Sequence, residues 1–493
     1  SSYTVAGLVS ETAVSSGDLA STTSGNGFSD LGGVAYGYYA NNGYRLGGPS
    51  NTYASYGATF ANTDVIGVAF DAANGTLTFY KNGATQGEAF TSIDTSETWF
   101  PFVHTFTNEP GVLLNNGQTA FAHTPPTGYV GINTTNLLAA SAPTIEDGSA
   151  HFQATTYSGV NGANSIEQSG NSTFQPDIAW IKRRDGTGAN GIFDSVRTSG
   201  EYLRTNANNA EASESSFSGF DANGFNFSAA DTDLESNTAG RTYVGWQWKA
   251  GGSASANNDG NTTVQLSANP TAGFSIGTFN SGVQASGITL GHGLGVAPKM
   301  IWMKTSSAVT PWWIFHEDVG NTKYLQFGAT GNLTPATNAK VWRNTSPSTS
   351  APFVFTTSGE EGGSGWLADN QDNVFYAFAE IPGFSKFGSF SSGSSGDPLV
   401  HCGFTPALIF LKRTSSNDDW YVHDTTRDPN NPAYRYLIWN TTAQEASNSS
   451  VYIDIISNGF VCDLGGIVTA NNDMVFGAWA ENPFAGTTPV TAR

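Results

Sequence analysis

The sequence has few of the residues that specify several other classes of protein. Its 493 residues include only two cysteines and three methionines, and 20 lysines and arginines together. Two cysteines cannot form a disulfide framework, and a bond between Cys402 and Cys462 or two buried thiols would both fit this count. No apolar run approaches the ~18 residues that a membrane span needs, so we expect no insertion into a membrane.

The charge balance argues against one further class of partner. Acidic residues number 40, and the formal net charge is −20 at pH 7. The field of such a chain repels a phosphate backbone, so we expect no nucleic acid as partner.

Glycine and small polar residues are abundant. The chain holds 58 glycines and 20 prolines, and no stretch has the periodicity of an amphipathic helix. This composition is typical of short strands joined by tight turns, which predicts an all-β protein.

One pattern occurs three times in the last two-thirds of the chain. A proline is followed within two residues by four apolar residues that end at a lysine. The copies span 176–182, 298–304 and 406–412. Each is followed by a tyrosine-leucine pair (Tyr202-Leu203, Tyr324-Leu325 and Tyr436-Leu437) and then by an aromatic-rich strand, at 243–248, 374–378 and 474–479. A repeat of roughly 100 residues is long enough to bury a core of its own.

The apolar runs also indicate the architecture. They do not alternate with polar residues, which indicates a strand covered on both faces, as in the middle of a sandwich. We therefore expect serial antiparallel β-sandwich domains of jelly-roll type, arranged as beads, with close packing between neighbours left open. The predicted domains are 1–130, 131–250, 251–383 and 384–493.

The first of these domains is a different module. Residues 64–71 alternate as a strand, Asn74-Gly75 predicts a two-residue turn, and residues 76–80 return as the partner strand. Lys81-Asn82-Gly83 predicts another turn. With Gly37-Tyr-Tyr39 before it, this run resembles the SPRY domain family. The resemblance implies a bent antiparallel β-sandwich that binds partners through loops at one rim, and the family's usual opening strand is expected to precede Ser1.

The whole sequence resembles a group of proteins of marine bacteriophages and prophages. In that group a SPRY-like module precedes tandem lectin-like repeats of the concanavalin A type, as in the run from Gly128 to Leu137 and the three copies after it. The resemblance implies a virion surface protein, such as a tail fibre, a tail appendage or a head fibre.

Several polar residues recur without pointing to catalysis. Lys182, Lys304 and Lys412 are expected to pair with nearby carboxylates or carbonyls at strand ends. His316 and His423 fall where the first copy has Asp194, which favours a polar edge contact over a metal ligand. No serine nucleophile elbow or zinc-spaced histidine pair occurs, and we expect no catalytic residue.

Calcium is the one cofactor that the sequence leaves open. Carboxylates gather in loops, and oxygen-rich loops of this kind hold calcium in other proteins. They are Asp221, Asp231, Asp233, Glu235, Asp369, Asp372, Asp418, Asp419 and Asp428. No calcium-binding motif spacing is present, so otherwise no cofactor is expected.

Aromatic residues beside glycine and polar residues are the candidate ligand-binding side chains. Rings in such positions stack on sugars or on another subunit. The candidates are Tyr39, Tyr44, Trp312, Trp366 and Trp420. Trp313 and Tyr421 are expected to turn inward, because adjacent strand residues point to opposite faces.

These observations predict a non-enzymatic structural and receptor-binding component of a phage virion. We expect it on the virion surface, as a homo-oligomer of open stoichiometry that contacts other virion subunits and a host surface glycan or protein. A secreted bacterial lectin-like adhesin and a polysaccharide-degrading tail component are the alternatives.

Overall fold

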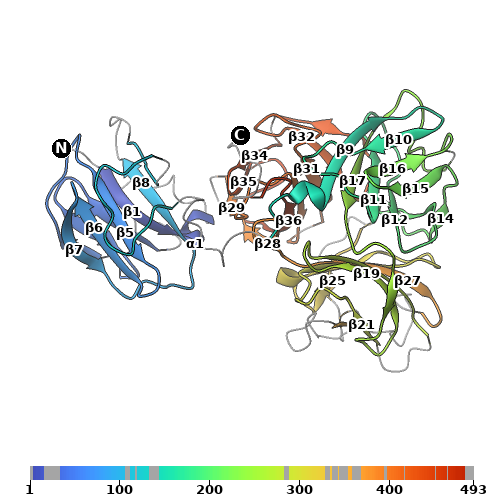
Figure 1. The fold of residues 1–493 in the computed structure, drawn as a ribbon, viewed down its shortest axis with the longest axis horizontal. Helices are drawn as coiled ribbons and strands as arrows, with labels where there is room; N and C mark the ends of the chain where they lie inside the picture. Colours follow the sequence, from blue (N-terminus) through green and yellow to red (C-terminus); the bar gives the residue numbers. More distant parts are fainter. Residues whose placement is uncertain are drawn as a thin grey trace. The chain divides into compact units, whose positions relative to one another are not determined.

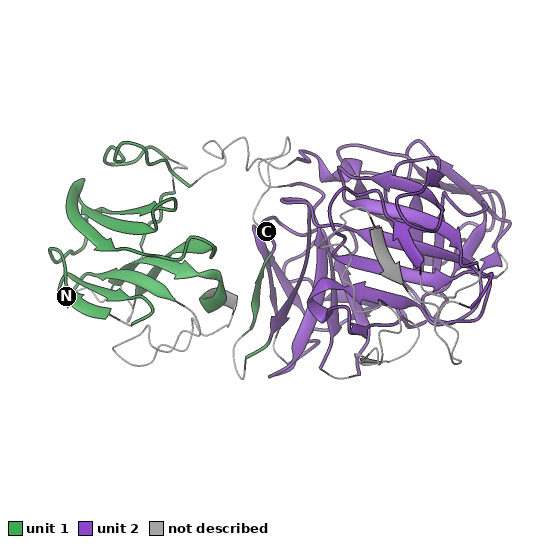
Figure 2. Ribbon diagram, turned by 90° about the horizontal axis from the view of Figure 1, so that it is seen from below, with its two compact units in different colours: residues 1–142, 392–401 green, residues 143–391, 402–493 purple. Residues whose placement is uncertain are grey.

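The computed structural model divides the chain into two compact units. It describes residues 4–15, 34–50, 52–105, 112–116, 119–132, 144–231, 233–282, 288–327, 334–335, 342, 354–357, 368–393, 397–415, 417–449, 451–463 and 465–483. Residues 1–142 with 392–401, a segment that carries β29 (Leu399–His401), form the first unit, and residues 143–391 with 402–493 form the second (Figure 2). No helix among the described residues has the length and apolar character to cross a membrane.

The first unit is an antiparallel β-sandwich. One sheet has the order β4 (Thr52–Ser55), β3 (Tyr44–Gly47), β2 (Ala35–Tyr39), β1 (Thr4–Ser10), β8 (Trp99–Thr105), with the short helix α1 (Glu11–Ser15) after β1. The other consists of β5 (Ile66–Asp71), β6 (Thr76–Lys81) and β7 (Ala84–Phe90). Tyr38 and Phe79 are fully buried between the sheets, with ring centroids 5.3 Å apart.

The two hairpin turns of the second sheet differ from each other. Asn82 and Gly83 have φ of 50° and 80° between the paired residues Lys81 and Ala84, so the predicted turn there is a two-residue turn of the left-handed type. The prediction for Asn74-Gly75 was wrong. β5 and β6 pair as far as Asp71 and Thr76, which leaves a four-residue loop, and the Asp71 carboxylate accepts hydrogen bonds from the backbone of that loop.

The second unit contains three large sheets of related topology, visible as separate groups of strands in Figure 1. In the first repeat the order is β14 (Ala212–Ser213), β13 (Glu201–Leu203), β12 (Gly191–Asp194), β11 (Ile178–Arg183), β17 (Thr242–Trp248), β9 (Phe152–Ser158). In the second it is β18 (Ser255–Asn257), β19 (Val264–Asn269), β20 (Phe274–Asn280), β27 (Asp372–Phe378), β22 (Met300–Thr305), β23 (Trp313–His316). In the third it is β28 (Ser385–Ser391), β36 (Asp473–Trp479), β30 (Leu408–Arg413), β31 (Trp420–Asp424), β32 (Arg435–Ile438), β33 (Ala446–Ser447).

Smaller elements complete the repeats. The first has a three-stranded sheet of β10 (Asn164–Glu167), β16 (Gly224–Phe227) and β15 (Phe217–Asp221), and the 3-10 turn η4 (Gly148–Ala150). The second pairs β21 (Ile288–Gly291) with β26 (Val354–Thr357) and β24 (Lys323–Tyr324) with β25 (Thr334–Pro335), and has the 3-10 turn η5 (Glu317–Val319). The third pairs β34 (Ile453–Ile456) with β35 (Gly459–Cys462), and both Cys402 and Cys462 are buried thiols.

The strand pairing confirms that the three copies share a four-stranded core, with the orders β9-β17-β11-β12, β20-β27-β22-β23 and β28-β36-β30-β31. The predicted apolar runs form β11, β22 and β30, and each pairs with the aromatic-rich strand of its own repeat. Trp180 lies opposite Trp246, Trp302 opposite Tyr376, and Phe410 opposite Gly477. A Cβ at Gly477 would lie 2.2 Å from the Phe410 ring, so only glycine fits at this position. The all-β fold with serial antiparallel sandwiches is therefore confirmed.

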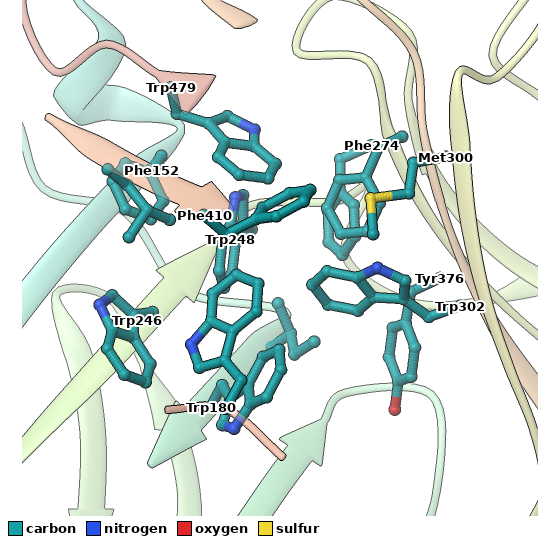
Figure 3. Close-up of a cluster of buried hydrophobic side chains, with 14 of the residues drawn as sticks. Phe152, Trp180, Trp246, Trp248, Phe274, Met300, Trp302, Tyr376, Phe410 and Trp479 are labelled. Carbon is teal, nitrogen blue, oxygen red and sulfur yellow. The ribbon is translucent and has the colours of Figure 1, made fainter. Parts of the chain in front are cut away.

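The three repeats are not separate beads, because their large sheets pack on one common core. Rings from all three repeats meet in it (Figure 3), with the Trp180 centroid 5.3 Å from that of Trp302 and 4.3 Å from that of Trp439. One face of each large sheet is thus covered by the other two repeats. The domain boundaries at 250/251 and 383/384 fall between strands and stay a prediction.

Candidate functional site

Two of the predicted ligand-binding rings lie inside this core. Trp312 and Trp420 are both fully buried, so the prediction that they are exposed was wrong. Trp312, directly before β23, and Trp313, its first residue, do point to opposite sides, as expected, but both sides are covered. Trp366 lies outside the described residues.

The buried tryptophans join one repeat to the next. Trp312 Nε1 of the second repeat donates a hydrogen bond of 2.8 Å to the Arg204 carbonyl of the first. Trp420 Nε1 of the third repeat donates one of 3.0 Å to the Gln326 carbonyl of the second. The equivalent position in the first repeat is Asn190, whose Nδ2 donates to the Trp439 carbonyl of the third. The three bonds therefore run in one direction around a closed ring.

A second ring of contacts uses buried carboxylates. The Tyr376 hydroxyl of the second repeat donates a 2.7 Å hydrogen bond to Asp194 of the first. Trp246 Nε1 of the first repeat donates a 2.9 Å hydrogen bond to Asp424 of the third. Tyr376 and Trp246 occupy equivalent positions, as do Asp194 and Asp424.

Each of these aspartates is held by an arginine three residues later. Arg197 Nε donates to Asp194 at 2.7 Å and its Nη2 donates to the Ile192 carbonyl at 2.9 Å. Arg427 makes the same two contacts, with Asp424 and with the Val422 carbonyl. Burial alone would lower the pKa of Arg197, but the charge of Asp194 raises it overall, so this ion pair stays charged. The repeated Asp-x-x-Arg spacing is a signal in the sequence that our sequence analysis missed.

The second repeat replaces the aspartate by His316. This ring is fully buried and its Nε2 lies 3.3 Å from the Phe476 carbonyl of the third repeat, which closes the second ring. Burial lowers the pKa of His316 and keeps the ring neutral near pH 7. The alignment of His423 with Asp194 was wrong, because the strand register places Asp424 there and puts His423 opposite Ile409.

The three repeated lysines are buried at strand ends and bind carbonyl groups, as predicted. Lys182 donates 2.7 Å to the Thr441 carbonyl, Lys304 donates 3.0 Å to the Ala308 carbonyl, and Lys412 donates to the Asp418 carbonyl. Burial lowers the pKa of Lys182 and of Lys304 to about 7 and that of Lys412 to about 8. Their hydrogen bonds to loops suit a structural role.

The carboxylates that suggested calcium mostly accept hydrogen bonds from nearby groups. Asp428 accepts from the backbone N–H of Tyr434 and of Arg435, at 2.8 and 2.9 Å, and Asp221 accepts from Asn226 Nδ2 at 2.7 Å. Within the described ranges, no three His, Cys, Asp or Glu side chains are arranged to hold a metal ion. Calcium binding stays a prediction.

The candidate ligand-binding surface that the structure retains is a pair of tyrosines on the first unit. Tyr44 begins β3 and Tyr53 lies in the edge strand β4, with ring centroids 4.9 Å apart. Asn42 Oδ1 accepts from the Tyr44 N–H at 3.0 Å, and its Nδ2 donates to the Tyr53 hydroxyl at 2.7 Å. The side chain of Tyr53 is 54% exposed. Asn42 therefore links the backbone of Tyr44 to the hydroxyl of Tyr53 and fixes the Tyr53 ring before any ligand arrives.

This tyrosine pair, Tyr44 with Tyr53, was only half predicted. Tyr44 was a candidate, whereas Tyr53 was missed because the run Thr52–Ser55 contains no motif. Tyr39, the third tyrosine of interest, ends β2 opposite Val5 and is half-buried. The exposure of Tyr53 follows from the structure alone, in which half-buried and exposed residues alternate along β4.

Comparison with known families supports this division of the chain. Residues 9–116 match the SPRY domain, and residues 147–483 match a domain of unknown function, DUF7483. No curated protein matches the chain. The match to DUF7483 covers more than half of the sequence and coincides with the three repeats that share one core.

Proposed function

The chain belongs to the DUF7483 family, and we propose that this member is a non-enzymatic component of a bacteriophage virion surface. It serves as a tail fibre, a tail appendage or a head fibre, and it binds a host surface glycan or protein. The concanavalin A-like, lectin-like character of the repeats is part of this proposal. So are a homo-oligomeric state and contacts with other virion subunits.

The observation that carries the proposal is the tyrosine pair on the SPRY unit, in which Tyr53 is exposed and Tyr44 half-buried. An aromatic ring presents a flat apolar face that stacks on a sugar ring or on an apolar side chain, and a rigid ring loses little entropy on binding. Asn42 supplies that rigidity for Tyr53, since it binds the Tyr53 hydroxyl and the backbone N–H of Tyr44. The pair therefore offers a preorganised contact on the edge of a stable sheet.

The second unit supports a role as scaffold. Its three repeats are joined by hydrogen bonds between buried groups in two closed rings, and the tryptophans that could have bound ligand are used in the core. A ring of this kind has no repeat that can detach without leaving buried polar groups unpaired, which costs about 1–3 kcal/mol for each group. Such rigidity suits a protein that displays surface.

Binding of the full chain to arrayed bacterial surface glycans tests the tyrosine pair. Removing one ring with Tyr53→Ala should weaken binding by about tenfold or more, as for an aromatic hot spot. Tyr53→Phe keeps the ring and should retain most of the affinity. Tyr80→Ala, at a half-buried position in the other sheet of the first unit, is the control and should bind as the unchanged chain does. Equal binding by Tyr53→Ala and the unchanged chain would reject the pair as the contact.

Two further measurements separate the proposed role from its alternatives. Gold-labelled antibody against the chain should decorate phage particles. Label on the bacterial surface instead would favour a secreted lectin-like adhesin. Release of shorter saccharides from a bound glycan would favour a polysaccharide-degrading tail component and overturn the non-enzymatic role.

A further inference from the structure

Two of the seams between repeats are built from equivalent residues but carry opposite charge. The acidic seam, where the first repeat meets the second, contains Asp194, Arg197, Glu201 and Glu211, with Ser306 from the second repeat. The basic seam, where the third repeat meets the first, contains Asp424, Arg427, Arg435 and Glu445, with Arg184 from the first repeat. The strand pairing makes these sets equivalent position by position.

The same backbone contact closes both seams. The Glu211 N–H donates to the Ser306 carbonyl at 2.8 Å, and the Glu445 N–H donates to the Arg184 carbonyl at 2.9 Å. Within the two sets named above, the charge difference arises from two positions. Glu201 is replaced by Arg435, and Ser306 is replaced by Arg184.

In the acidic seam the excess charge is negative. Arg197 contacts Asp194 at 2.7 Å and Glu211 at 3.4 Å, and Glu201 lies close by. Burial and the charge of Glu211 raise the pKa of Glu201. One arginine against three carboxylates leaves a formal charge of −2.

In the basic seam the excess charge is positive. Arg184 binds the Glu445 carboxylate through two hydrogen bonds, of 2.9 and 3.0 Å. Arg427 and Arg435 approach the same carboxylate at 3.2 Å each. Three arginines against Asp424 and Glu445 leave a formal charge of +1 on these five side chains, in a chain whose net charge is −20. The nearby carboxylate of Asp428 is buried and accepts from the backbone N–H of Tyr434 and of Arg435. Each seam also has one buried lysine nearby, Lys304 or Lys182, so the lysines do not change the difference of three charges.

The basic seam is open to solvent at one side chain. Arg435 is 49% exposed, whereas Arg427 is fully buried and Glu445 is 10% exposed. Arg435 uses Nη1 for Glu445, and within the described residues no hydrogen bond occupies the edge formed by its Nε and Nη2. That edge has the spacing that binds a carboxylate through two parallel hydrogen bonds.

We propose that the basic seam binds carboxylate groups of an acidic polysaccharide, with Arg435 as the first contact and Arg184 behind it. A carboxylate is favoured because the seam already holds one, that of Glu445, on the guanidinium of Arg184. At physiological salt the rest of the negative chain is screened beyond ~8 Å, so a local positive site can act. The choice of a polysaccharide rests on the proposed function, whereas the carboxylate site itself does not.

The test measures binding of polygalacturonate to the full chain in 0.15 M salt, with neutral dextran as the uncharged polymer. Arg435→Glu restores the residue type that the acidic seam has at this position, and it should weaken binding of polygalacturonate about tenfold or more. Arg435→Gln should weaken it less. Lys386→Glu is the matched control, since Lys386 is 37% exposed and pairs with Glu380 away from the basic seam, and it should bind normally. Unchanged unfolding temperatures would show that the variants fold.

Three outcomes would overturn the site. The first is binding of dextran as strong as that of polygalacturonate. The second is an equal loss of binding in Arg435→Glu and Lys386→Glu. The third is full displacement of the polymer by millimolar inorganic phosphate, which would indicate a phosphate site instead. Tyr53→Ala should leave binding of polygalacturonate unchanged. Suppose that Arg435→Glu binds polygalacturonate as well as the unchanged chain does, while Tyr53→Ala loses binding to the glycan array. This result would reject the carboxylate site and leave the proposed function standing.

Discussion

The Tyr376 hydroxyl of the second repeat donates a 2.7 Å hydrogen bond to the buried carboxylate of Asp194, 182 residues away in the first repeat. A hydrogen bond to a buried charge contributes more than one between neutral groups, about 1.5–3 kcal/mol. This contact and its counterpart between Trp246 and Asp424 tie the repeats into one unit.

Tyr376→Phe should lower the free energy of unfolding by about 1.5–3 kcal/mol, because the Asp194 carboxylate loses one of its buried donors. Denaturant unfolding of the full chain measures it. Tyr436→Phe is the control, since no hydrogen bond of the Tyr436 hydroxyl is found among the described residues, and its effect should be below about 0.5 kcal/mol. Equal effects of the two variants would contradict a linking role for Tyr376.

Trp312→Phe should destabilise the second unit more than Trp302→Phe. Both rings are fully buried in the common core, and both variants remove the same atoms. Only Trp312 uses Nε1, which bonds to the Arg204 carbonyl, whereas Nε1 of Trp302 has no partner within the described part of the chain.

The difference between the two variants should be about 1–3 kcal/mol, the cost of leaving the Arg204 carbonyl unpaired in the core. Thermal unfolding of the two variants side by side measures it. If Trp302→Phe proved the more destabilising, core packing would be the main role of these side chains, rather than the hydrogen bonds that join the repeats.

The buried lysines predict that stability rises with pH above neutrality. Lysine in an unfolded chain has a pKa of about 10.5, whereas burial lowers the folded pKa of Lys182 and Lys304 to about 7 and that of Lys412 to about 8. Between these values the unfolded chain binds protons that the folded chain does not. The stabilising contribution is therefore complete above pH 10.5 and is lost as the pH falls through the folded pKa values.

Unfolding free energies measured from pH 8 to 9.5, below the titration of ordinary tyrosines, should show this slope. Each lysine contributes up to about 1.4 kcal/mol per pH unit. Lys304→Met should reduce the slope, and Lys323→Met, at an exposed position, should leave it unchanged. A flat profile for the unchanged chain would show that the lysines are hydrated or charged in the folded state.

Much of the fold followed from local pattern. The apolar runs predicted β11, β22 and β30 because a strand covered on both faces has no polar alternation. Asn82-Gly83 predicted a tight turn because both residues tolerate positive φ. Asn74-Gly75 misled for the same reason, since the Asp71 carboxylate stabilises a longer loop at the same place.

The candidate site followed less well, because exposure is not a local property. Tyr44 was identified from its polar neighbours, but the same reasoning selected Trp312 and Trp420, which the packing buries. Tyr53 was missed although it forms the exposed half of the pair. Neighbouring residues say little about burial when the covering surface comes from a segment about a hundred residues away, as Arg204 does for Trp312.

The sequence by itself determined the strands, their threefold repetition and the SPRY-type hairpins, because these depend on periodicity and turn chemistry within a few residues. Only the tertiary structure decided what lies against each face of a strand. The predicted separate domains pack as three repeats around one core. This packing places Asp194 against Tyr376 and brings together the charged residues of the acidic and basic seams. Periodicity shows which side chains share a face, but the partner of that face depends on how distant segments pack.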